Sequence, residues 1–110
     1  MEDRDEAVAL ADVTATPQAA VNSWNMTPPM MADLVVTAIA ELVKERVSGV
    51  VVTHGTDTVE ETAMLAWMLN RTAEPIVFTA AMRNLSDAGP DGPRNLRDAI
   101  RVAAAPESAN

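Results

Sequence analysis

The chain has 110 residues, no cysteine and a formal net charge of −8. A chain of this length has room for one small domain, which buries roughly 65% of the surface that the unfolded chain exposes. Its acidity argues against a nucleic-acid surface, because neutralising phosphates takes clustered Lys and Arg, and these are scattered here. The absence of cysteine excludes disulfides, a thiolate nucleophile and cysteine-based metal sites.

The apolar segments are too short to predict a membrane span. None approaches the roughly 20 consecutive apolar residues that a transmembrane helix needs. The amino terminus, Met-Glu-Asp-Arg-Asp-Glu, is charged and lacks the apolar core of a signal peptide. We therefore expect no signal peptide and no membrane partner, and the cytoplasm is the default compartment.

The first third of the chain predicts two short strands and one helix. Apolar stretches at 7–10 and 19–22 are compatible with strands, and a Thr-Pro turn at 16–17 separates them. Thr27 and Pro28 then supply an N-cap and a proline in the first helical turn. This helix is expected to end near Ser48-Gly49. Its apolar face consists of Met31, Leu34, Val35, Ala38, Ile39, Leu42 and Val43.

A buried strand and a second helix follow. The valine run at 50–52 has no polar alternation, which is typical of a strand buried on both faces of a parallel sheet. Helical spacing then runs over 59–69, with Trp67 at a core position. Residues 54–58 therefore lie where the carboxyl end of a strand meets the amino end of a helix. Open α/β sheets bind ligands there, and the position favours a carboxylate or a developing oxyanion.

A second strand and a third helix complete the pattern. The apolar run at 76–79 is again short, and it is followed by a loop over 84–93 and by helical spacing over 95–105. Repeated strand and helix order is the pattern of a three-layer α/β fold with right-handed crossovers. We expect a Rossmann-like (flavodoxin-like), mostly parallel sheet. The sheet is expected to be incomplete, because no strand follows the last helix.

The polar residues after the first buried strand also have a purely structural interpretation. Thr58 followed by Glu61 is a capping-box pattern, and Asp57 could equally cap the helix. His54 is the only histidine, so we expect it to form structural hydrogen bonds rather than to bind a metal. Turn chemistry explains Asp91-Gly92-Pro93 better than a metal-binding loop does.

Three blocks of sequence favour a functional interpretation. The string Val-Thr-His-Gly-Thr-Asp-Thr-Val-Glu-Glu-Thr-Ala at 52–63 closely resembles the second signature of the bacterial-type L-asparaginase family, which includes glutaminase-asparaginases. Ala81-Met82-Arg83, followed by Asp91-Gly92-Pro93 and Asn95-Leu96, resembles the stretch that follows in that family. Upstream, the segment 22–28 resembles the family's substrate-binding serine loop. The blocks occur in the family's order and cover most of the chain.

The resemblance implies hydrolysis of the side-chain amide of L-asparagine, or of L-glutamine, by a threonine-based mechanism. In the family, a threonine of an amino-terminal Thr-Gly-Gly-Thr segment attacks the amide, ammonia leaves, and water hydrolyses the acyl-enzyme. Thr56 and Asp57 match residues that assist proton movement together with a later lysine, and Asp57 also matches the contact to the α-ammonium group. Ser23 matches the contact to the α-carboxylate. Gly55 belongs to the same substrate-binding turn, and Ala81 matches a residue whose backbone carbonyl meets the leaving amide.

The same resemblance implies that parts of the site lie outside this chain. No Thr-Gly-Gly-Thr segment is present, and Lys44, the only lysine, is predicted on the polar side of the first long helix. Trp24 and Asn84 replace a small polar residue and a proline that many relatives carry. The family's carboxy-terminal domain, which completes the site of a neighbouring subunit in a homo-oligomer, has no counterpart. We therefore expect part of an amino-terminal domain that needs no metal or cofactor and is inactive alone.

Two alternatives remain open. The glutaminase-like subunit of a tRNA-dependent amidotransferase carries a similar Thr-Asp signature and would have an extra domain upstream. A truncated chain would instead fold in part and catalyse nothing. Such a chain would expose a sheet edge and an apolar face, which predicts self-association.

Overall fold

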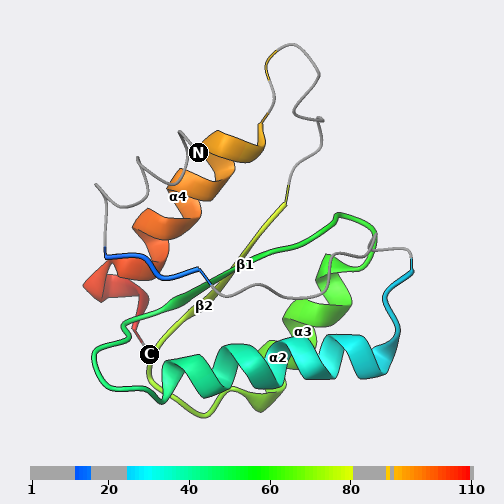
Figure 1. Ribbon diagram of the computed structural model, residues 1–110, viewed down its shortest axis with the longest axis horizontal. Coiled ribbons are helices and arrows are strands. Elements are labelled where there is room, and N and C mark those ends of the chain that lie inside the picture. Colours follow the sequence, from blue (N-terminus) through cyan, green and yellow to red (C-terminus); the bar gives the residue numbers. More distant parts are fainter. Residues whose placement is uncertain (1–11, 16–24, 81–88, 90, 110) are drawn as a thin grey trace.

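The computed structural model describes residues 12–15, 25–80, 89 and 91–109, so the strands expected at 7–10 and 19–22 lie outside the described residues. The order of elements is α2 (Pro28–Leu42), β1 (Val50–Thr53), α3 (Val59–Leu69), β2 (Ile76–Thr79), α4 (Gly92–Ala104) and the 3-10 helix η2 (Pro106–Ser108). In the described part of the chain, β1 and β2 form a parallel sheet with Val50 opposite Ile76 and Thr53 opposite Thr79. Helices α2 and α3 lie on one side of the strands and α4 on the other (Figure 1). The predicted three-layer α/β fold with parallel strands is confirmed.

Helix α2 begins as the sequence predicts and ends earlier. The Thr27 hydroxyl accepts a hydrogen bond from the Met30 N–H, with 3.3 Å between Oγ1 and N, and proline occupies the first turn. The helix buries Met31, Val35, Ala38 and Leu42. The predicted end near Ser48-Gly49 is wrong, because the helix ends at Leu42. The apolar spacing continues to Val43, but that side chain is 70% exposed. Arg46 then adopts a φ of 69°, which turns the chain away from the helical path.

Helix α3 has the predicted bounds but not the predicted core. It buries Thr62 and Ala66, which are four residues apart and therefore share one face. The prediction that Trp67 is a core residue is wrong, because this side chain is 77% exposed. One residue after Ala66, a helix has rotated by about 100°. Trp67 therefore points away from the buried face.

The turn between α3 and β2 is closed by side chains of its own residues. The Asn70 amide Nδ2 donates to Glu74 O at 3.0 Å, and its Oδ1 accepts from both the backbone N–H and the hydroxyl of Thr72. The Thr72 hydroxyl also accepts from the Glu74 N–H at 3.2 Å. The polar segment at 70–74, which follows α3 in the sequence, is therefore an ordered turn.

Helix α4 begins at Gly92, three residues before the predicted helical spacing, and buries Ala99, Ile100 and Ala103. Its close contact with the strands depends on Gly49, where an added Cβ would lie 2.6 Å from Ala103 O. Val52 is buried, whereas Val50 and Val51 are half-buried. The prediction that the whole run is buried is therefore confirmed only at Val52.

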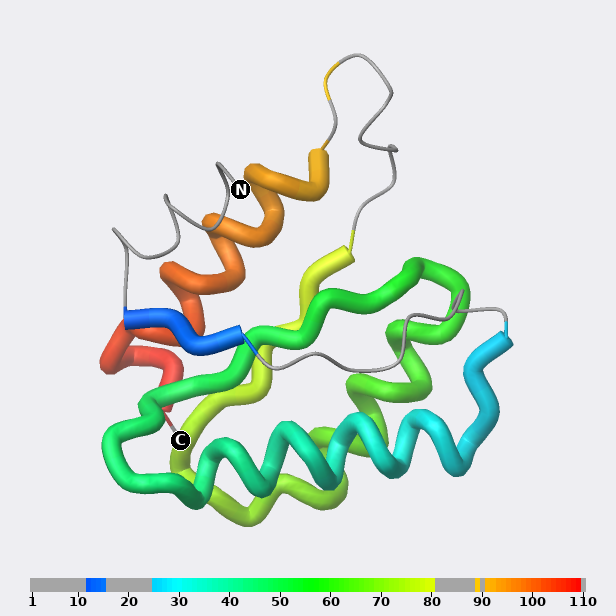
Figure 2. The backbone as a smooth tube through the Cα atoms, in the orientation of Figure 1, coloured from blue at the N-terminus to red at the C-terminus, as the bar shows by residue number. Residues whose placement is uncertain are grey.

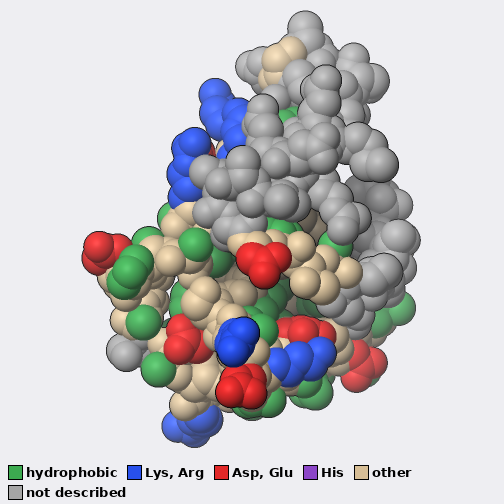
Figure 3. All heavy atoms as spheres, turned by 60° about the vertical axis from the view of Figure 1, so that its left-hand side comes forward, with side chains coloured by type: hydrophobic (Ala, Val, Ile, Leu, Met, Phe, Trp, Pro, Cys, Tyr) green, Lys and Arg blue, Asp and Glu red, His purple; other side chains and the backbone are tan. Residues whose placement is uncertain are grey.

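Apolar side chains also reach the surface of the described part of the molecule. In Figure 3 they lie among acidic and basic side chains over the lower part of the face shown. The large exposed ones include Met64, Trp67 and Met68 on α3, Val36 on α2 and Val102 on α4. None of the described helices combines the length and the apolar character that crossing a bilayer requires.

Candidate active site

The predicted site is a turn at the carboxyl edge of the sheet. After the last residue of β1, the His54 N–H donates to Thr79 O at 2.9 Å, so the strand pairing extends to the start of the turn. Residues 55–58 follow, and α3 begins at Val59. The backbone leaves β1 at the same end of the sheet at which it leaves β2 (Figure 2). The predicted position, between the end of a strand and the start of a helix, is confirmed.

The side chains proposed for chemistry are accessible in this turn. Gly55, Thr56 and Asp57 are exposed, and Thr58 is half-buried. Glu60 and Glu61 occupy the first turn of α3, so three carboxylates gather around the amino end of this helix. Their charge favours a cationic group of a ligand, such as an ammonium, beside the anion-binding amino end of the helix.

The capping-box interpretation of this turn is wrong. Thr58 is the N-cap residue of α3, but its φ of −128° and ψ of 14° are not the extended conformation of a capping threonine. Its side chain makes no capping hydrogen bond to the helix. Glu61 is present in the first turn as the pattern requires, yet the reciprocal bond from Thr58 is not formed. Helix capping by Thr58 therefore does not explain the hydroxyl at this position.

His54 forms structural hydrogen bonds, as the sequence predicts. Its ring Nδ1 lies 2.7 Å from Gly55 O and its Nε2 lies 2.9 Å from the Thr62 hydroxyl. A carbonyl oxygen only accepts, so Nδ1 carries the proton that it donates to Gly55. The Thr62 hydroxyl, which is fully buried, also donates to Thr58 O at 3.3 Å. The helical spacing over 59–69 does not indicate this role of Thr62, because it does not show which groups the hydroxyl meets.

The second block of the resemblance attaches α4 to the end of β2. Asp91 is the N-cap residue of α4, and a proline occupies the first turn, so the predicted turn leads directly into the helix. The Asn95 amide Nδ2 donates to Ala80 O at 2.8 Å, which fixes the backbone immediately after β2. Sequence reasoning assigned no role to Asn95. The partner lies 15 residues away, so no local pattern indicates it.

Two of the predicted substrate contacts, Ser23 and Ala81, lie outside the described residues. The structure therefore brings together Gly55, Thr56 and Asp57 in one exposed turn. Lys44 lies elsewhere, beyond the end of α2, where its Nζ is 2.9 Å from a carboxylate oxygen of Glu41. Lys44 precedes the amino end of β1, whereas the predicted site follows the carboxyl end of that strand.

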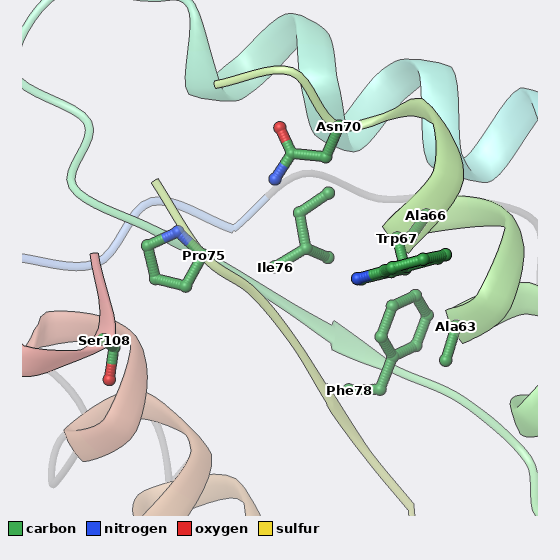
Figure 4. Close-up of a pocket in the computed structure, with 8 residues that line it drawn as sticks. All are labelled: Ala63, Ala66, Trp67, Asn70, Pro75, Ile76, Phe78 and Ser108. Carbon is green, nitrogen blue, oxygen red and sulfur yellow. The ribbon is translucent and has the colours of Figure 1, made fainter. Parts of the chain in front are cut away.

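A groove of about 450 Å³ lies apart from this turn. Figure 4 shows it between α3, β2 and η2, and its walls come from Ala63, Ala66, Trp67, Asn70, Pro75, Ile76, Phe78 and Ser108. None of the residues predicted for substrate binding lines it. Pro75, Ile76 and Phe78 line it, so it lies along β2, whereas the predicted site follows the carboxyl end of β1. The groove is therefore not the predicted site.

Curated proteins with similar sequences are named as asparaginases. The chain is 41% identical over 100 residues to "Probable L-asparaginase 4" of Schizosaccharomyces pombe, which covers 91% of this chain and 28% of that protein. It is 36% identical over 99 residues to "L-asparaginase 2" of Bacillus subtilis, a match that covers 90% of this chain and 26% of that protein. It is 38% identical over 102 residues to "Glutaminase-asparaginase" of Acinetobacter glutaminasificans, a match that covers 92% of this chain and 30% of that protein. The chain thus spans less than a third of each of these relatives.

A solved structure and a family model agree with these similarities. The probable cytoplasmic L-asparaginase of Campylobacter jejuni superposes with a TM-score of 0.89 at 36% identity, covering 96% of this chain and 32% of that one. The family model described as "Asparaginase, N-terminal" matches residues 1–110. The chain therefore belongs to the asparaginase family and corresponds to part of its amino-terminal region.

Proposed function

We propose that this chain supplies the Thr56–Asp57 part of an L-asparaginase site, which hydrolyses the side-chain amide of L-asparagine to L-aspartate and ammonia. The observation that carries the proposal is the placement of both side chains. They are exposed in the turn between the carboxyl end of β1 and the amino end of α3. The names of the relatives support L-asparaginase over the amidotransferase subunit, and one of them adds L-glutamine as a second substrate.

The geometry suits an amino-acid substrate. The Asp57 carboxylate pairs with the α-ammonium group, and the neighbouring acidic side chains of Glu60 and Glu61 strengthen the attraction. The Thr56 hydroxyl, one residue away, takes part in moving the proton of the attacking group. Backbone N–H groups near the start of α3 favour the negative charge that develops on the amide oxygen.

Further substrate contacts come from residues of the other two blocks. In our proposal Ser23 binds the α-carboxylate, and the backbone carbonyl of Ala81 accepts from the leaving amide. The Asn95–Ala80 hydrogen bond supports this second contact, because it fixes the peptide immediately before Ala81. Gly55 completes the turn beneath the substrate.

The reaction also needs groups that this chain does not contain. Attack on an amide requires a hydroxyl nucleophile with a base, and no Thr-Gly-Gly-Thr segment is present in the sequence. Lys44 is unsuitable as the base, because it pairs with Glu41 away from the turn. We propose that the chain forms part of an amino-terminal α/β domain in a homo-oligomer. The strand with the nucleophile and the carboxy-terminal domain then come from outside residues 1–110.

Ammonia release from L-asparagine tests whether the reaction needs groups from outside residues 1–110. The 110-residue chain alone is expected to release no ammonia above the buffer blank, because it lacks the nucleophile. A release that Thr56→Ala abolishes would contradict this expectation. The matching experiment replaces the corresponding segment of the Campylobacter jejuni protein with this chain, which restores the missing groups, and the chimera is expected to release ammonia.

Substitutions in the chimera then test the two residues. Thr56→Ala is expected to lower kcat by about 10²-fold or more, because it removes a proton-transfer group. Asp57→Ala is expected to raise KM as well, since the α-ammonium loses its partner. Glu45→Ala is the control, because its side chain is also exposed and acidic but lies between α2 and β1, away from the turn. Kinetics of Thr56→Ala and Asp57→Ala that match those of Glu45→Ala would refute the proposal.

A further inference from the structure

The turn that carries Thr56 and Asp57 is held at both of its ends by one hydrogen-bonded network. The carbonyl oxygens of Gly55 and Thr58, which flank the two residues, are bound by His54 and Thr62 respectively. His54 and Thr62 are in turn bound to each other. We propose that His54 and Thr62 are positioning residues, which together set the orientation of Thr56 and Asp57 toward the substrate. This inference deepens the proposed function and rests on it for the role of the residues that are positioned.

The first contact fixes the peptide plane between Gly55 and Thr56. The Gly55 carbonyl points to the His54 ring, with 2.7 Å between O and Nδ1. In a planar trans peptide the N–H points opposite to the carbonyl. The Thr56 N–H is therefore directed away from the His54 ring. The network thus orients a backbone donor beside the two exposed side chains, where a substrate oxygen can accept it.

The second contact ties the other end of the turn to the core. The Thr62 hydroxyl lies 2.9 Å from His54 Nε2 and 3.3 Å from Thr58 O. In the neutral ring with Nδ1 protonated, both of these atoms are acceptors for its single proton. Thr62 is completely buried on α3, so its hydroxyl is held out of water and depends on these partners. The turn is therefore fixed relative to a side chain whose own position is set by core packing.

The imidazole ring is itself held by the neighbouring strand. The His54 backbone N–H donates to Thr79 O at 2.9 Å, and the ring meets Phe78 edge-on with centroids 6.2 Å apart. Contacts with β2 thus fix the position of the ring, and the ring in turn fixes the position of the Gly55 carbonyl. Displacing a catalytic group by about 1 Å can cost about 10²-fold in rate, so this chain of contacts matters to a reaction.

Nuclear magnetic resonance of the 110-residue chain tests the proposal without requiring activity. Because His54 is the only histidine, its two ring nitrogens give unambiguous ¹⁵N signals. At alkaline pH, we expect a protonated Nδ1 and a bare, hydrogen-bonded Nε2. The amides of residues 55–58 are expected to be as rigid as those of α3, with order parameters of about 0.85. A ring protonated at Nε2 with Nδ1 bare would overturn the proposal before any variant is made.

Variants of Thr62 separate positioning from general stability. Thr62→Val, which keeps the shape but removes the hydroxyl, is expected to shift the Nε2 signal and to lower the order parameters of Thr56 and Asp57 to about 0.6 or less. Thr62→Ser is expected to restore both, since it returns the hydroxyl. Val35→Ala is the control for general stability, because Val35 is 1% exposed and belongs to α2, outside the hydrogen-bonded network of the turn.

Each outcome decides between the two proposals. If the turn stays rigid in Thr62→Val, or if Val35→Ala loosens it equally, His54 and Thr62 do not position it. Should Thr62→Val fail to fold, Thr62→Ser and the ring signals of the parent chain still test whether His54 and Thr62 position the turn. If the turn loosens as expected but Thr56→Ala leaves the chimera fully active, the network stands and the proposed function fails.

Discussion

At the scale of single residues, Gly49 sets the distance between a strand and a helix. A Cβ at this position would lie 2.6 Å from the backbone oxygen of Ala103, closer than non-bonded atoms approach. The oxygen belongs to α4 and cannot rotate away as a flexible side chain would. Glycine is therefore required here for close packing rather than for a left-handed backbone, which among the described glycines only Gly89 adopts.

Replacing this glycine tests the packing distance. Gly49→Ala is expected to lower the free energy of unfolding by about 1–3 kcal/mol, because α4 must move away from β1. Urea denaturation followed by circular dichroism measures the change. Ser48→Ala is the control, since Ser48 is exposed, and it is expected to stay within about 0.5 kcal/mol of the parent. Equal stability of Gly49→Ala and the parent would show that the helix lies further from the strand.

At the scale of elements, the start of α2 depends on one hydroxyl. The Thr27 side chain accepts from the Met30 N–H, one of the amides that have no partner inside the helix. Thr27→Ala is expected to lower the free energy of unfolding by about 1 kcal/mol, whereas Thr27→Ser keeps the acceptor and most of the stability. Thermal unfolding of the three proteins measures the difference. A loss in Thr27→Ser as large as in Thr27→Ala would show that the methyl group, not the hydroxyl, is what matters.

The sequence predicts some element boundaries better than others for a physical reason. Strand β2 has the predicted bounds, and β1 extends only one residue beyond the predicted valine run. Both apolar runs directly follow Gly49 or Pro75 and lead into a threonine before the chain turns polar. The helical spacing predicts too late an end for α2, since Val43 continues the spacing although it faces solvent. Periodicity shows which side of a helix is apolar. It does not show how far the neighbouring elements extend to cover that side.

The same distinction applies to the candidate site and to Trp67. The position of the turn follows from the pattern of strand and helix, and the roles that we propose for Thr56 and Asp57 rest on the resemblance to the family. The hydrogen bonds that hold the site could not be predicted, because they join residues of different elements. His54 and Thr62 are 8 residues apart, and Asn95 and Ala80 are 15 apart. Trp67 was assigned to the core from spacing that could not reveal the open groove beside it.

At the scale of the whole molecule, the exposed apolar side chains of α3 predict self-association. Met64, Trp67 and Met68 are each more than half exposed, and Trp67 also lines the groove beside β2. Contiguous apolar surface of this kind favours contact with a second molecule. The net charge of −8 opposes it, so association is expected to increase with salt, which screens the repulsion.

Sedimentation at several protein concentrations measures this association. Trp67→Lys is expected to reduce it, because the change places a charge at the centre of the apolar surface. Val102→Lys is the matched control, since it makes the same change at an exposed position of α4, on the other side of the sheet. A parent chain that stays monomeric at high concentration and high salt would contradict the prediction, as would an equal effect of the two variants.

The turn between α3 and β2 has a consequence for the order of events in folding. Its hydrogen bonds join Asn70, Thr72 and Glu74, which are only two to four positions apart. Contacts between such near neighbours form at a small cost in chain entropy, whereas the parallel pairing of β1 with β2 must first close the long loop that contains α3. We therefore expect this corner to form early, as a local nucleus that turns β2 back along α3 before the sheet assembles.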